Sequence, residues 1–183
     1  VMDGGIVKYL YNAGTNGIDN ISTTYGLTNP SFKDLKFGSL FSTVVSDVGI
    51  IGSSYEDVQK RQSLVLGDLG FRFNYLAKDI NNHFPLSVQM SGFSLQENFD
   101  KMKTFLHETI CNFRLDEIKR VEDLTKFYIA NFEKIITGSG HAFAMYSASS
   151  QVSLKATIEE YSGGISSLHN IKSLRDENAN IDL

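Results

Sequence analysis

Cysteine, excess basic charge and long apolar runs are all scarce in this chain of 183 residues. Its one cysteine, Cys111, rules out a disulfide within the chain and is typical of a reducing compartment, the cytoplasm or an organelle matrix. The formal net charge of -4 argues against a nucleic acid as the main partner, because phosphate binding favours a basic surface. The apolar runs fall short of the ~20 residues of a membrane-spanning helix, so we expect no membrane partner.

The remaining composition is that of an ordinary globular protein, with 42% hydrophobic and 21% charged residues. The length suits one domain. We expect that domain to cover residues 1–175, and residues 176–183 to be a flexible tail or a cut boundary. The start, Val1-Met2-Asp3, shows no signal peptide and also suggests a cut boundary.

The N-terminal part of the sequence alternates between strand and helix patterns. Ile6–Tyr11 is rich in β-branched and aromatic residues, which predicts a strand. Asn16-Gly17 tolerates positive φ at both positions and predicts a hairpin turn into a return strand over Ile18–Leu27. A helix is expected from Asn29-Pro30-Ser31 to Gly49. Its apolar face contains Phe32, Leu35, Leu40, Val44 and Val48.

Two capping-box patterns mark further helix starts. The first, Ser54-Tyr55-Glu56-Asp57, begins a helix that we expect to run through Leu69 and to end at Gly70. Phe71–Ala77 and Leu86–Ser91 alternate in polarity, which predicts an antiparallel pair around a turn at residues 81–83. The second box is Ser94-Leu95-Gln96-Glu97. The apolar face of its helix contains Leu95, Phe99, Met102, Leu106 and Ile110.

The C-terminal third is predicted to be a series of helices separated by glycine. A long helix with apolar residues every three or four positions ends at Gly138, and a short one follows over His141–Ser149. A third runs from near Ser153 to Gly163-Gly164, and the last covers Ile165–Leu174. The order of elements predicts an α+β fold of two layers, a mixed or antiparallel sheet with helices on one face, followed by a helical tail.

The sequence His107-Glu108-Thr109-Ile110-Cys111 is similar to the H-E-x-x-H zinc helix, with Cys in the last place. On a helix, His107 and Cys111 lie one turn apart and could share a metal ion. The neighbouring core positions, however, place His107 and Glu108 on the solvated flank, and no third ligand is near in sequence. The alternative is a surface histidine beside a half-buried cysteine.

Other local patterns give no active site. Ser139-Gly140-His141 lacks the G-x-S-x-G elbow and an acid partner, and an N-cap at Ser139 explains it structurally. The acidic pairs Asp116-Glu117, Glu122-Asp123 and Glu159-Glu160 diverge on a helix, so we expect them to face water. We assign no catalytic residue. The positions expected to be sensitive, through backbone geometry, are Gly138, Gly140, His141, Gly163 and Gly164.

Several segments together resemble a known family. They are Thr15-Asn16-Gly17-Ile18 before a strand, Leu35 to Val48, the Ser54-Tyr55 helix start, Ser139 to Ala144, and Gly163-Gly164-Ile165. Over roughly residues 5–175 the chain resembles the presequence-peptidase (falcilysin-type) branch of the pitrilysin/insulinase zinc metallopeptidases. Specifically, it is similar to the first domain of the C-terminal half of such an enzyme.

The resemblance implies a clam-shell enzyme of two halves that encloses unfolded peptides. Its zinc, held by an inverted H-x-x-E-H helix and a distal Glu in the N-terminal half, would activate water with a Glu. In this chain the corresponding helix has Phe37-Gly38-Ser39-Leu40-Phe41-Ser42-Thr43, without His or Glu. The Arg and Tyr that the last domain of the family supplies also lie outside this chain. No catalytic or metal residue is therefore carried over.

Two hypotheses follow. The first is a non-catalytic domain of a zinc metalloendopeptidase that degrades unstructured peptides, forming part of the chamber wall beside the catalytic N-terminal half. In that case zinc and activity belong to the parent protein, and the chain alone cleaves nothing. The alternative is a free-standing peptide-binding or scaffold module that accepts a peptide at a sheet edge. An excised domain should expose an apolar patch that a free-standing module should lack.

Overall fold

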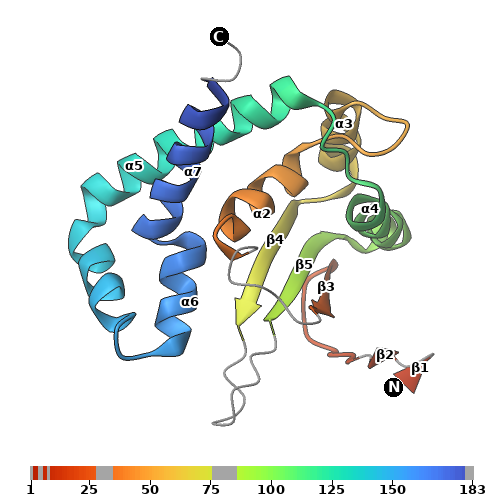
Figure 1. Cartoon of the computed structure of the whole chain (residues 1–183). Helices are drawn as coiled ribbons and strands as arrows, with labels where there is room; N and C mark the ends of the chain where they lie inside the picture. Colours follow the sequence, from red (N-terminus) through yellow and green to blue (C-terminus); the bar gives the residue numbers. More distant parts are fainter. Residues whose placement is uncertain (1, 4–5, 8, 28–34, 76–85, 180–183) are drawn as a thin grey trace.

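A three-stranded antiparallel sheet with helices against one face forms the first part of the chain (Figure 1). The computed structural model describes residues 2–3, 6–7, 9–27, 35–75 and 86–179. Strands β3 (Ile18–Gly26), β4 (Asp68–Tyr75) and β5 (Leu86–Leu95) lie in the order β3-β5-β4. The predicted antiparallel pairing of β4 with β5 is confirmed. Two short strands, β1 (Met2–Asp3) and β2 (Ile6–Val7), pair with each other.

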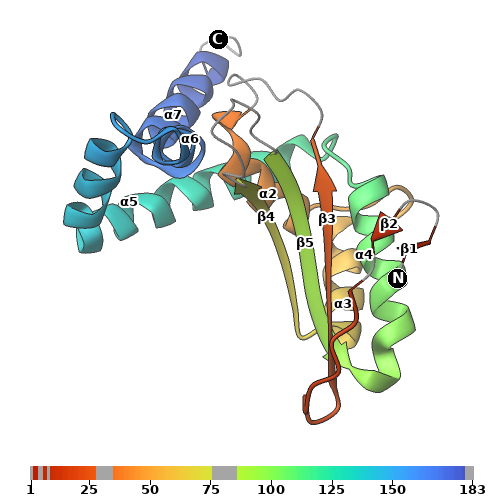
Figure 2. The same ribbon diagram turned by 90° about the horizontal axis from the view of Figure 1, so that it is seen from below.

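Six α-helices of the described residues have the bounds α2 (Gly38–Asp47), α3 (Tyr55–Val65), α4 (Phe99–Asn112), α5 (Ile118–Ser149), α6 (Leu154–Gly163) and α7 (Ile165–Ala179). A 3-10 turn, η1 (Gln96–Asn98), precedes α4. The strands lie in front of α2 and α3 in Figure 2, which therefore looks onto the sheet face without helices. The predicted α+β class is confirmed. Within the described ranges, no helix has both the length and the apolar character needed to cross a membrane.

The main core lies between the sheet and helices α3 and α4. Alternation along β4 and β5 places Leu69, Val88 and Met90 on the same sheet face, toward the helices. Met102 of α4 is fully buried beneath them. The buried members of this cluster are Ile50, Val58, Leu66, Leu69, Met90, Met102, Phe105 and Leu106. Burial of each large apolar side chain contributes about 1.5–3 kcal/mol.

Helix α2 connects this sheet core to the helical tail. On one side, the ring of Phe41 contacts those of Phe71 and Phe113, with centroids 6.0 and 5.7 Å away. On the other, Val44 and Val48 are buried with Leu124 of α5. A separate cluster joins α5 to α7 through Ile129, Leu168 and Ile171. In Figure 1, α5 starts beside α3 and extends away from the sheet, and α6 and α7 return along it.

The predicted N-terminal hairpin is only partly correct. Asn16 and Gly17 adopt φ values of 55° and 83°, so the turn is confirmed, and the strand after it is β3. Of the expected first strand, Ile6–Val7 forms β2, whereas Tyr9–Tyr11 has no regular structure and is at least 75% exposed. The partner of β3 is β5, in a continuous register of nine residue pairs. This non-local pairing places Ile21 against the main core, which the local hairpin pattern could not indicate.

Two helix boundaries differ from the sequence pattern. Helix α3 ends at Val65 rather than Gly70, because the chain becomes extended at Leu66 and Leu69 belongs to β4. Ser54 does cap α3, with its hydroxyl accepting a hydrogen bond from the Asp57 amide. Ser94 does not cap a helix: it lies in β5 and its hydroxyl donates to the Leu95 carbonyl. The second capping box was therefore wrong, and α4 begins at Phe99.

The break predicted after Gly138 is present as a kink within α5, where two helical pieces join at Ser139. Helix α5 continues to Ser149 and is kinked at Ser139, whose φ and ψ are -137° and 31°. Gly and Ser neighbours are common causes of such kinks. The start of α6 after Ser153 is confirmed, and α7 extends beyond Leu174 to Ala179. The predicted helix start at residues 29–31, the turn at residues 81–83 and residues 180–183 lie outside the described residues.

Candidate functional site

Residues 37–43, which the resemblance aligns with a zinc-binding helix, lie at the start of α2, with Phe37 as the N-cap. Its hydroxyl groups are used within the helix: Ser42 and Thr43 donate to the carbonyls four residues earlier, at 3.0 and 3.2 Å. Phe41 packs against the aromatic rings of the sheet. This donor set does not fit a zinc ion, which requires imidazole, thiolate or carboxylate ligands.

His107 and Cys111 lie on the same face of α4, with Sγ 3.7 Å from Nδ1. Both side chains are exposed, so the cysteine is not half-buried. The pKa of Tyr25 is raised, mainly by burial and secondarily by charge on Cys111. Glu108 turns away to form an ion pair with Arg61 at 2.6 Å. Among the described residues no three His, Cys, Asp or Glu side chains gather as metal ligands.

Ser139 and His141 do not form a catalytic pair in the part of the chain that the structure describes. Ser139 leaves the helical conformation at the kink, and His141 is exposed. The rings of Phe132 and Phe143, from the two sides of the kink, meet at a centroid distance of 5.4 Å. Gly138 and Gly140 have open space where a Cβ atom would lie. The geometry is that of a packed helix bend.

The corner between α6 and α7 depends on a buried carboxylate. Glu160 is 7% exposed, contrary to the expectation that the Glu159-Glu160 pair faces water. Its Oε1 atom accepts hydrogen bonds from the amide and hydroxyl of Ser166, both at 3.2 Å, in the first turn of α7. A Cβ atom on Gly164 would lie 2.1 Å from Glu160 Oε2, and one on Gly163 2.6 Å from Ser39 Oγ. Gly164 therefore leaves room for the Glu160 carboxylate, and Gly163 leaves room for the Ser39 hydroxyl.

In the acidic pair Asp116-Glu117, the Glu117 side chain also does not simply face water. The Glu117 carboxylate accepts hydrogen bonds from the amides of Gly49 at 2.8 Å and Tyr55 at 3.3 Å. Arg120 Nε donates to the carbonyl of Asp47, the last residue of α2, at 3.1 Å. The Arg120 guanidinium lies 4.4 Å from the centroid of the Tyr55 ring. These contacts attach the start of α5 to the loop between α2 and α3.

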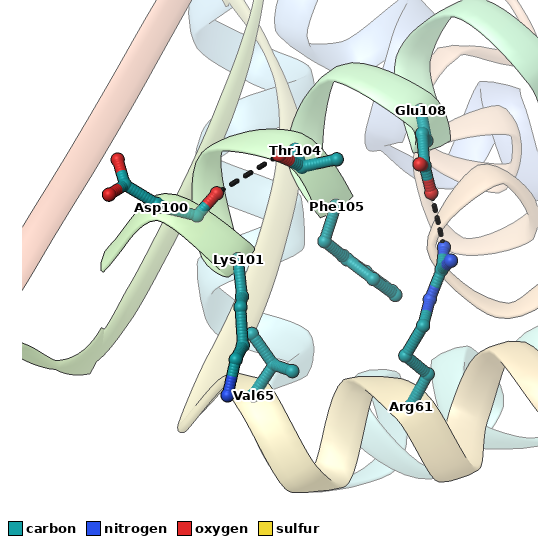
Figure 3. Close-up of a pocket in the computed structure, with 7 residues that line it drawn as sticks. All are labelled: Arg61, Val65, Asp100, Lys101, Thr104, Phe105 and Glu108. Carbon is teal, nitrogen blue, oxygen red and sulfur yellow. Dashed lines mark hydrogen bonds and ion pairs between the residues drawn. The ribbon is translucent and has the colours of Figure 1, made fainter. Parts of the chain in front are cut away.

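A pocket of about 420 Å³ lies between α3 and α4 (Figure 3). Val65 and Phe105 supply its apolar surface. At one end the Arg61 guanidinium is paired with Glu108 and lies 5.0 Å from the Phe105 ring centroid. Sequence analysis did not predict this pocket, because its two walls are far apart in the chain. The charge of Arg61 is already compensated by Glu108. The pocket therefore offers an apolar binding surface rather than a reactive group.

Comparison with known proteins gives a consistent result over most of the chain. Residues 3–174 match a family model described as associated with peptidase family M16, subfamily C. The chain is 26% identical over 171 residues to the mitochondrial presequence protease of Drosophila melanogaster, covering 92% of this chain and 16% of that protein. It is 22% identical over 163 residues to the mitochondrial presequence protease of Yarrowia lipolytica, covering 88% of this chain and 16% of that protein.

An uncharacterised protein of Borreliella burgdorferi is 23% identical over 154 residues, which is 82% of this chain and 15% of that protein. The chain thus spans about a sixth of the length of the curated relatives that it matches.

Proposed function

Because this chain belongs to the family of domains associated with the subfamily C peptidases of family M16, we propose that it is a non-catalytic domain of a larger zinc metallopeptidase. In this proposal it forms part of the wall of a chamber that encloses unstructured peptides, and its partner is the catalytic N-terminal half of the same protein. Zinc and peptide-bond hydrolysis then belong to that half, because α2 of this chain has no ligand set for the metal.

The observation that carries the proposal is a set of exposed apolar side chains at the turn between α5 and α6, which lies away from the sheet (Figure 1). We call the turn between α5 and α6 the α5–α6 tip, defined by Met145, Tyr146, Val152 and Leu154. These side chains are 70%, 55%, 88% and 41% exposed. Four exposed apolar side chains at one turn are suited to contact with another part of a larger protein. A free-standing module should not expose it.

The uncovered face of the sheet is suited to line a peptide chamber. Asn74 donates a hydrogen bond to Gln89, and Gln89 donates to Ser22, both at 2.5 Å, so amide and hydroxyl groups run across all three strands. No described helix packs on this face (Figure 2). A polar, hydrogen-bonding wall can contact the backbone of many extended peptides without selecting one sequence.

The compartment follows from the same proposal. Two relatives carry the word mitochondrial in their names, and this chain has one cysteine, which is exposed. We infer a reducing compartment, with the organelle matrix ahead of the cytoplasm.

Two experiments test the domain proposal. An antibody against this chain should detect a native polypeptide several-fold heavier than 20.4 kDa in an extract of the source cells. The purified chain should cleave no unstructured peptide, whereas mixing it with the separately folded remainder of the polypeptide should restore cleavage. A native band near the mass of this chain, or folded parts that gain no activity on mixing, would contradict the proposal.

The alternative function is a free-standing peptide-binding module, and one observation favours it: β3 lies at an edge of the sheet. Saturable binding of unrelated extended peptides by the isolated chain, with no partner protein, would support this alternative.

A further inference from the structure

The outer edge of β3 is unpaired with any other strand of the described residues. β3 pairs with β5 along all nine of its residues, and the order β3-β5-β4 leaves its other side at the border of the sheet. Among the described residues, no strand pairs with that side. An edge strand of this length presents a row of backbone N–H and C=O groups that can pair with another strand.

Edges that remain exposed in native proteins usually carry protection. Common devices are lysine, proline, a β-bulge or a very short strand. β3 has none of these: its sequence Ile18–Gly26 contains one charged residue, Asp19, no proline and no lysine, and its register with β5 is unbroken. The other border strand, β4, carries Arg72 and Asp68, and α2 packs against it. Unprotected edges of this kind are typical of strands that are paired in the complete protein.

Apolar groups flank the same edge. Ile18, at the start of β3, is 37% exposed, Tyr25 is 42% exposed and Leu27 is 39% exposed. An added strand would cover part of these side chains as well as the backbone groups.

We propose that the outer edge of β3 pairs with an extended segment of the parent polypeptide that lies outside these 183 residues. The inference rests on the proposed function, because it requires a longer chain. The relatives leave ample chain for this role, since the match covers only about a sixth of their length. The sheet of this domain is then completed by another part of the enzyme, and the added strand fixes the domain in the chamber wall.

The test is residue-resolved amide hydrogen exchange on the 183-residue chain and on the native polypeptide from source cells. In the chain alone, amides of β3 should alternate between slow exchange, for those bonded to β5, and fast exchange, for those on the outer edge. In the native polypeptide the fast amides should slow by about a hundredfold or more, as expected for ladder hydrogen bonds. Amides of β5, which is central in both, serve as the internal control.

Four outcomes would overturn the inference. Fast exchange of the outer amides in a native polypeptide that is several-fold larger would refute the added strand while leaving the domain proposal intact. Slow exchange already in the dilute chain would assign the edge to this chain's own residues. Slow exchange only at high concentration of the chain would assign it to a second copy. A native polypeptide of about 20 kDa would refute both proposals.

A proline pair gives a second readout. Thr23 and Thr24 are adjacent in β3, so only one of their amides points to the outer edge. Proline at that position is tolerated by an edge strand but not by a central strand. The variant of interest, Thr23→Pro or Thr24→Pro, is the one whose wild-type amide exchanges fast. In the chain alone this variant should leave the melting temperature unchanged, and in the native polypeptide it should lower the melting temperature. An equal effect in both proteins would contradict the inference.

Discussion

Glu117, the N-cap of α5, binds the N-terminus of α3, and Arg120, in the first turn of α5, binds the C-terminus of α2. Glu117 accepts a hydrogen bond from the amide of Tyr55, the first residue of α3, and Arg120 donates to the carbonyl of Asp47, the last residue of α2. An anion at a helix N-terminus and a cation at a helix C-terminus are both favourable. The first turn of α5 therefore attaches helices α5, α6 and α7 to helices α2 and α3 and, through them, to the sheet.

Removal of the Glu117 carboxylate should loosen this junction. Glu117→Ala leaves the amides of Gly49 and Tyr55 without their acceptor, so we expect a loss of about 1–2 kcal/mol in the free energy of unfolding. Glu117→Gln keeps one acceptor oxygen and should lose less. Urea denaturation followed by circular dichroism measures the difference. Glu122→Ala, at an exposed position of α5, is the control and should change stability by less than about 0.5 kcal/mol.

Three of the four glycines named from the sequence should separate into two classes. Gly164→Ala places a methyl group against the buried Glu160 carboxylate, so we expect a loss of about 1–3 kcal/mol. Gly138→Ala and Gly140→Ala meet open space at negative φ within α5, so they should be neutral or stabilise by up to about 1 kcal/mol. Thermal denaturation of the three variants checks the order. A Gly164→Ala protein as stable as the wild type would contradict this close packing, because the Glu160 backbone carbonyl also lies 2.6 Å from the Cβ position and cannot move aside as a side chain can.

The intermediate case is Gly163. Its Cβ atom would meet Ser39 Oγ at 2.6 Å, and a hydroxyl can move more easily than a buried carboxylate. Gly163→Ala should therefore cost less than Gly164→Ala, and the double variant with Ser39→Ala should recover stability. No recovery in the double variant would mean that the backbone, rather than Ser39, limits the site.

The main core depends on Met102, which is fully buried under the sheet. Met102→Ala should cost about 2–5 kcal/mol, because the lost contacts leave a cavity. Leu64→Ala is the matched control on α3, since Leu64 is 78% exposed, and should change stability by less than about 0.5 kcal/mol. Guanidinium denaturation gives both values, and similar losses in the two variants would contradict the assignment of the core.

Tyr128 should make stability fall at alkaline pH. Burial raises the pKa of Tyr128 above its usual 10, while a hydrogen bond with Ser39 opposes the shift. The folded state therefore keeps the phenol protonated after the unfolded chain has lost its proton, so stability present below pH 10 is lost as pH rises through the folded pKa. The slope from one such group is at most about 1.4 kcal/mol per pH unit. Denaturation between pH 9 and 11.5 should show a shallower decline for Tyr128→Phe than for the wild type.

Cys111 should react as an exposed thiol without a metal. One equivalent of thiol should react with a disulfide reagent in the native state, because the side chain is exposed. An equimolar amount of Zn²⁺ should not slow the reaction, since His107 and Cys111 supply two ligands and zinc sites need three or four. Protection by zinc that is lost in His107→Ala would instead establish a metal site at this pair.

The sequence by itself determined most of the elements and shows that α2 contains no His or Glu. Period-two alternation identified β4 and β5, apolar spacing identified Met102 and Leu106 on the buried face of α4, and Asn16-Gly17 identified the turn, because each is a property of neighbouring residues. The same local patterns misled where two signals overlap, as in the apolar run from Val65 to Leu69 that leaves a helix and enters a strand.

Only the tertiary structure decided which partners these elements choose. β3 pairs with the distant β5 instead of the strand before it, because that pairing packs Ile21 against the main core. Glu117 looked like a solvated acid in sequence, yet it binds the backbone amides of Gly49 and Tyr55, more than sixty residues away. Burial and helix-end electrostatics depend on the arrangement of residues far apart in the chain. That arrangement is also what leaves the α5–α6 tip and the outer edge of β3 open to another part of a larger protein.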